Sequence, residues 1–167
     1  DSSFCSGSTV DVIIDLAGVA NFTLDYGVNG GPTSTVVNGN QLVLPVNQST
    51  LFCLSTLTDG SGCATTLSDC LSLTELPLPV ANAGLDVDAC SNVDAVLGTG
   101  GLPGLTYAWQ PADYLDDATS PMPVFNHSNV TPAAEQYSYT LTVSDGTCIN
   151  SDDVVVTLYP LPLVDAG

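Results

Sequence analysis

Residues 77–84 read "PLPVANAG" and residues 160–167 read "PLPLVDAG", so the chain uses one short phrase twice. A repeat of this kind is the first feature to look for, because it fixes the domain organisation. The first copy leads into "LDVDAC", and a chain that ran from Gly167 into another Asp1 would read "VDAG-DSSFC" in the same way. We therefore expect one period of a longer head-to-tail array, the alternative being two modules from the end of a chain.

The cysteines repeat with the same period. Cys5 and Cys63 are separated by as many residues as Cys90 and Cys148, and the second member of each pair closes a similar phrase, "TDGSGC" or "SDGTC". The sequence therefore predicts two tandem modules, 1–79 and 80–167, joined within segment 77–84.

Hydrophobic residues recur with a period of two. In "VDVIIDL" (10–16), "ANFTLDY" (20–26) and "NQLVLPV" (40–46), apolar and polar residues alternate as in half-buried strands. The phrases "VNGGP" (28–32) and "VNGN" (37–40) carry the Asn-Gly pairs that favour tight hairpins. No stretch has a helical face, so we predict an all-β chain of two disulfide-stapled β-sandwich modules.

The second module has an "AG-x-D" start, the phrase "Y-x-W-x-P-x-x-x-L", "Y-T-L-T-V" and a "PLP" exit. In these motifs it resembles the PKD-like and Ig-like tandem repeats of giant secreted surface proteins of Bacteroidetes. The first module is similar to a sister repeat type. This resemblance implies Ig-like sandwiches in adhesins, gliding-type filaments or sheath-like fibres. The total absence of Lys and Arg departs from such repeats.

Nearly all ionisable side chains are acidic: the chain has 18 acidic residues, one His and no Lys or Arg, for a net charge of −18. Nucleic acid is excluded as a partner because nothing here can neutralise phosphates. Anionic membrane surfaces are disfavoured for the same reason, and no apolar run is long enough to span a bilayer. Schiff-base and Lys–Asn isopeptide chemistry are impossible.

Six cysteines without a C-x-x-C pair indicate disulfides and an oxidising compartment. We expect the pairs Cys5–Cys63, Cys90–Cys148 and Cys53–Cys70. The last pair follows from alignment of the modules, which sets Cys53 opposite Tyr139 and Cys70 opposite Val154 on neighbouring strands. Both cysteines are then expected to face the core.

Other candidate sites have ordinary explanations. His127 is too isolated to serve a hydrolase with Ser120 or Ser128, so no catalytic residue is predicted. The aromatic residues expected in the core are Trp109, Tyr107 and Tyr139, with Trp109 packed on a disulfide. Tyr114 is the better candidate for an exposed aromatic residue.

Two sets of polar residues are weaker candidates. Oxygen ligands for Ca²⁺, the one cofactor considered, are offered by the acidic residues Asp116, Asp117, Asp145, Asp152 and Asp153. Glycosylation sequons begin at Asn21, Asn47, Asn126 and Asn129. Charge on a solvated face and chance matches are the simpler explanations.

These observations favour a non-catalytic structural repeat of an extracellular filament or a long cell-surface adhesin. Its expected partners are further copies of itself, with surface glycans as a second class. One alternative is a carbohydrate- or surface-binding module assisted by Ca²⁺. Another is a pilin-like subunit that polymerises without covalent links by donating a strand.

Overall fold

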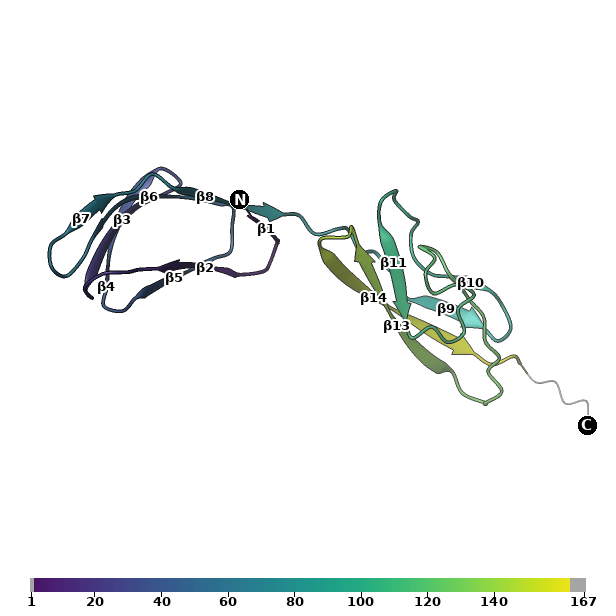
Figure 1. Cartoon of the computed structure of the whole chain (residues 1–167). Helices are drawn as coiled ribbons and strands as arrows, with labels where there is room; N and C mark the ends of the chain where they lie inside the picture. Colours follow the sequence, from purple (N-terminus) through teal and green to yellow (C-terminus); the bar gives the residue numbers. More distant parts are fainter. Residues whose placement is uncertain (1, 163–167) are drawn as a thin grey trace, which may run out of the picture. The chain divides into compact units, whose positions relative to one another are not determined.

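The computed structural model describes residues 2–162 and divides into two compact units, Asp1–Pro77 (module 1) and Leu78–Gly167 (module 2). All of its elements are strands, and each module is an Ig-like β-sandwich of two sheets (Figure 1). The predicted fold class is therefore confirmed. The division after Pro77 falls inside the predicted joint.

Module 1 has a large sheet and a two-stranded sheet. The large sheet has the order β1(Ser2–Cys5), β8(Cys70–Leu76), β6(Thr50–Thr58), β3(Phe22–Val28), β4(Gly31–Val37), with β7(Ala64–Thr66) also paired to β6. The smaller sheet pairs β2(Val10–Asp15) with β5(Gln41–Val46). The predicted alternation places the inward residues between the sheets, in a core that contains Phe4, Val12, Leu24, Tyr26, Val46, Phe52 and Leu73.

The two Asn-Gly turns of module 1 differ. Asn29 and Gly30 both have positive φ and close the β3–β4 hairpin, as predicted. The second predicted hairpin, at 37–40, is wrong. There the chain leaves β4 and crosses to β5 in the other sheet, because β5 takes β2 as its partner.

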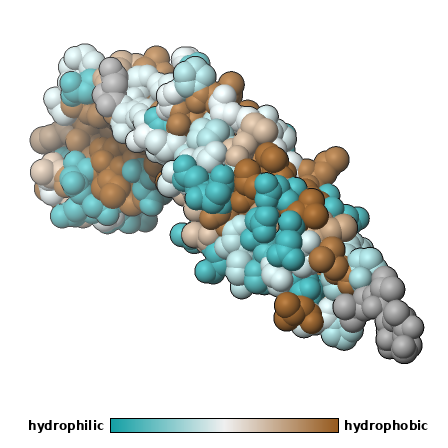
Figure 2. Space-filling model, turned by 90° about the vertical axis from the view of Figure 1, so that its right-hand side faces the viewer, coloured by the Kyte–Doolittle hydropathy of each residue, from teal (hydrophilic) through white to brown (hydrophobic). Residues whose placement is uncertain are grey.

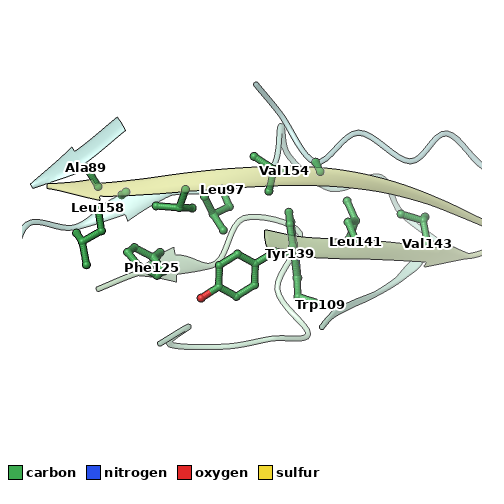
Figure 3. Close-up of a cluster of buried hydrophobic side chains, with 12 residues drawn as sticks. Ala89, Leu97, Trp109, Phe125, Tyr139, Leu141, Val143, Val154 and Leu158 are labelled. Atoms are coloured by element: carbon green, nitrogen blue, oxygen red, sulfur yellow. The ribbon is translucent and has the colours of Figure 1, made fainter. Parts of the chain in front are cut away.

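Module 2 has a four-stranded sheet and a two-stranded sheet. The first has the order β11(Thr106–Gln110), β13(Glu135–Ser144), β14(Ile149–Tyr159), β9(Val87–Cys90). The second pairs β10(Ala95–Val96) with β12(Val124–Phe125). Figure 3 shows the cluster of apolar side chains that fills this module.

Trp109 and Tyr139 are the largest members of that cluster, each no more than 2% exposed. Their polar atoms are satisfied by backbone carbonyls: Trp109 Nε1 donates to Ser120 O at 2.9 Å, and the Tyr139 hydroxyl donates to Asp113 O at 2.8 Å. Burial, and secondly the charge of Asp113, raise the pKa of Tyr139 to about 12. Tyr107 packs at the edge of the core and is half-buried.

The first and last strands pair in the same way in both modules. β1 runs parallel to β8 and sets Cys5 opposite Leu76, while β9 runs parallel to β14 and sets Cys90 opposite Tyr159. In each module a cysteine thus lies beside the residue that precedes Pro-Leu-Pro. We call this the trailing end of a module, and the end where its last strand begins the leading end.

Two of the three predicted disulfides are wrong, since Cys63 and Cys90 are exposed free thiols. Cys63 precedes the final strand segments β7 and β8 at the leading end, whereas Cys5 lies at the trailing end. In module 2, likewise, Cys148 lies at the leading end and Cys90 at the trailing end. The last strand of each module separates the two members of a pair: Cys90 lies opposite Tyr159, at the far end of the strand from Cys148. At a rise of about 3.3 Å per residue this strand keeps the two cysteines roughly 35 Å apart, whereas a disulfide needs Cα atoms within about 7 Å. Trp109 therefore packs in the core without the predicted Cys90–Cys148 bridge.

The third pair, Cys53–Cys70, is confirmed, with 4.1 Å between the Cα atoms. Its predicted place in the core is wrong, because Cys70 is exposed and Cys53 is only half-buried. For Cys53 the cause is a β-bulge: Asp25 faces Thr56 but Tyr26 faces Leu54, so Ser55 is an extra residue in β6. One inserted residue moves the side chains beyond it to the other face of the sheet. Cys70, counted back from Leu76 as from Tyr159, matches exposed Asp153 and not Val154.

Candidate functional site

The lone histidine takes part in an aromatic cluster. The ring of His127 stacks on Tyr114 with 3.7 Å between centroids, and Tyr137 meets both rings edge-on. The Tyr137 hydroxyl donates to Glu135 at 2.6 Å, which, together with burial and the Glu135 charge, raises its pKa to about 12. Tyr114 is 43% exposed, but one face of its ring is covered by His127.

The five predicted calcium ligands do not converge. Within residues 2–162 no group of three or more His, Cys, Asp or Glu side chains is placed to hold a metal ion. Asp152 and Asp153 are neighbours on β14 and point to opposite faces. The structure does not bring the predicted set together as one metal site.

Three of these aspartates, all in loops, accept hydrogen bonds from nearby backbone amides. Asp116 Oδ1 accepts from Val124 N at 2.7 Å. Asp117 Oδ1 accepts from the hydroxyl and the amide of Thr119, the hydroxyl bond being the main cause of its lowered pKa. Asp145 Oδ1 accepts from the amides of Thr147 and Cys148 in the β13–β14 turn.

The sequon residues have different surroundings. Asn129 is 5% exposed, and its side-chain amide donates to the carbonyls of Ala133 and Leu158. Its amide nitrogen is therefore committed to the fold. Asn126 donates to Asp94. Asn21 and Asn47 are exposed, and their modification stays a prediction.

A set of hydrogen bonds fixes the first copy of the repeated phrase. We call residues 77–84 the joint segment. Within module 2 it runs along the start of β14, where Asn150 Nδ2 donates to Pro79 O at 2.9 Å and Ala83 N donates to Asp152 Oδ2 at 2.8 Å. Just after the segment, Val155 N donates to Asp86 Oδ1 at 2.9 Å.

The joint segment also reaches the second sheet of module 2. Ala83 is fully buried in the core, and its carbonyl accepts from Gly98 N at 3.0 Å, just after β10. Gly84 then turns with φ of 91°, a conformation that suits glycine. The segment therefore closes the side of the sandwich between its two sheets.

Sequence reasoning assigned Asp152 to a metal and missed its contact with Ala83. The available signal was the repeat itself, since Ala83 and Gly84 recur as Ala166 and Gly167. A small residue followed by glycine suits a place where backbone must enter a core. The second copy ends outside the described residues.

The trailing end of module 2 carries an open apolar recess of about 700 Å³. Pro160, Leu161 and Pro162 line it, together with Asn129 and Val130. Val130 is 89% exposed. The chain thus leaves module 2 beside apolar surface.

No protein-family model matches this chain, and no curated protein matches it. Among solved structures it is similar to the I-band fragment I67–I69 from titin, with 11% identity and a TM-score of 0.41, covering 96% of this chain and 62% of that one. It is also similar to Sidekick-1 immunoglobulin domains 1–4, with 9% identity and a TM-score of 0.38, covering 98% of this chain and 46% of that one. The chain thus spans less than two thirds of either structure.

Among residues 2–162, no helix is long and apolar enough to cross a membrane.

Proposed function

We propose that this chain is a non-catalytic structural repeat of an extracellular filament or long cell-surface adhesin, of the kind its motifs resemble in Bacteroidetes. One observation carries the proposal. Both modules pair their first strand parallel to their last, and both last strands run directly into Pro-Leu-Pro. The connection that leads from module 1 into module 2 is therefore repeated where module 2 ends.

A connection of this kind suits a mechanical element. Proline fixes its own φ and restricts the residue before it, so the Pro-Leu-Pro phrase is short and stiff. The Cys53–Cys70 disulfide supports an oxidising, extracellular setting. The net charge of −18 without any Lys or Arg keeps copies apart in solution except where they are joined.

A glycan-binding function has less support. Tyr114, the best exposed aromatic candidate, stacks on His127 instead of presenting both faces to a sugar. The predicted calcium ligands are dispersed over turns and opposite strand faces. A glycan array with and without chelator measures this alternative directly.

The size of the native material on a denaturing, reducing gel tests the proposal. We expect a ladder or band far above 17.1 kDa, the mass of this chain. Trypsin finds no site, so fragments should be made by limited cleavage at Asp, which leaves some of the bonds at Asp165 and Asp1 intact, and a peptide that spans Gly167 into Asp1 identifies the array. A single band at the mass of this chain would contradict the covalent array.

A further inference from the structure

Module 1 has an open apolar groove at the side where module 2 is closed. A groove of about 320 Å³ lies between β2 and the start of β8, lined by Val12, Ile14, Phe52, Leu54 and Leu71. A second recess of about 240 Å³ shares Val12 and Leu71 and extends to β1. Figure 2 shows apolar side chains reaching the surface of both modules.

The groove corresponds to the place that the joint segment fills in module 2. There the segment lies between β14 and the end of β10, directly before β9. In module 1 the groove lies between β8 and β2, directly before β1. Cys5 precedes β2 by as many residues as Cys90 precedes β10, so the two sheets are equivalent.

An acidic side chain is also in the matching place. Counting back from Leu76 and from Tyr159, which precede Pro-Leu-Pro, Asp69 holds the position of Asp152. Asp69 lines the groove and is exposed. Its carboxylate is thus placed to accept a backbone amide, as Asp152 accepts that of Ala83.

We propose that this groove binds residues 160–167 of a second copy, with Ala166 between the sheets and its amide donating to Asp69. The inference rests on the proposed array, because it names the partner that each copy meets. The occupant is the second copy of the joint segment, which shares Pro, Leu, Pro, Ala and Gly with the first at the same positions. The surrounding aliphatic side chains supply the burial that Ala83 finds in module 2.

Binding of a synthetic acetylated peptide, residues 160–167, to the full chain tests the groove. We expect saturable shifts of the methyl resonances of Val12, Ile14 and Leu71 in the NMR spectrum. Peptide with Ala166→Trp should bind at least tenfold more weakly, because the corresponding residue Ala83 is fully buried in the core of module 2, and a much larger side chain overpacks such a position.

Substitution of Asp69 tests the proposed hydrogen bond to the peptide. Asp69→Ala should weaken the peptide about fivefold or more, since it removes a charged acceptor. Asp88→Ala, which removes an equal charge from an exposed position of β9 in module 2, is the matched control and should leave binding unchanged. Thermal unfolding of both variants establishes that they fold.

The outcomes separate this inference from the proposed function. If millimolar peptide causes no shifts, the proposed binding in the groove is overturned, because linked copies reach effective concentrations of about that size. A high-mass ladder on the gel would still support the array. Shifts confined to module 2, or equal affinity for Asp69→Ala and the parent chain, also overturn binding in the groove. Binding together with a single low-mass band upholds the groove and overturns the covalent array.

Discussion

Ala83 donates its amide to Asp152 Oδ2 at 2.8 Å, and Ala83 is fully buried. Asp152→Ala leaves this amide without its acceptor inside the core, so we expect module 2 to lose about 1–3 kcal/mol of unfolding free energy. The only tryptophan, Trp109, lies in module 2, so denaturant unfolding followed by its fluorescence reports this module alone. Asp153→Ala, on the exposed face of the same strand, is the control and should change stability by less than about 0.5 kcal/mol. Equal losses in both variants would count against the contact.

The Cys53–Cys70 disulfide closes a loop with a sequence separation of 17. The chain-entropy model gives about 3 kcal/mol for a loop of this length. We expect the double variant Cys53→Ser, Cys70→Ser to lose about that much in module 1, measured by far-ultraviolet circular dichroism. The Trp109 fluorescence transition should not move, because it reports module 2. A shift of both transitions would show that the two modules unfold together.

The one-sided charge predicts stabilisation by salt. With −18 and no Lys or Arg, long-range interactions between side chains are repulsive apart from those of His127. Raising NaCl from about 10 mM to 1 M shortens the Debye length from about 30 Å to about 3 Å, so we expect the Tm to rise. A neutral osmolyte at matched osmolality controls for solute exclusion. A Tm that falls, or that follows the osmolyte, would sink this prediction.

Asp59 and Asp145 occupy equivalent turns and both have lowered pKa values. The Ser61 hydroxyl is the main cause at Asp59, and the Cys148 amide at Asp145. A folded pKa below the unfolded value gives stability that is complete above about pH 4 and is lost as pH falls through the folded pKa. Carboxyl-carbon NMR titration should therefore place both groups below 3.8. Asp145→Asn, which keeps an acceptor oxygen, should remove that residue's acid-dependent part; an unchanged acid transition would argue against its role.

The free thiols predict a specific cross-link between copies. Cys63 lies at the leading end of module 1 and Cys90 at the trailing end of module 2, and the proposed head-to-tail array would bring these two ends of successive copies together. Mild oxidation should yield mainly Cys63–Cys90 pairs, identified by mass spectrometry after cleavage at Asp. Cys63→Ser should abolish that product. Statistical mixtures of Cys63–Cys63 and Cys90–Cys90 pairs would contradict head-to-tail order.

Alternation of apolar residues was sufficient to predict the strands. Phe22, Leu24 and Tyr26 are all buried, as their spacing requires. The face of Cys53 was not predictable by alignment, because the extra Ser55 produces no composition signal and yet inverts the strand beyond it. A bulge is determined by pairing with neighbours, which a single strand sequence does not contain.

The cysteine pairing failed for a topological reason. Equal spacing identifies equivalent positions in the two modules, but it does not show that the two cysteines within one module lie close together. The parallel register that sets Cys5 opposite Leu76 sends it away from Cys63. Which strands pair in parallel depends on contacts distant in sequence. The contact of Ala83 with Asp152 was missed for the same reason.

The parallel pairing of first and last strands has a mechanical consequence. When a module is pulled by its two chain ends, β9 is drawn one way and β14 the other, along their common direction. The hydrogen bonds between Val87–Cys90 and Val156–Tyr159 are then loaded in shear. They must break together and cannot open one after another from one end. β1 and β8 load module 1 in the same geometry. Tension applied along the chain therefore meets its greatest resistance at the strands beside each Pro-Leu-Pro phrase.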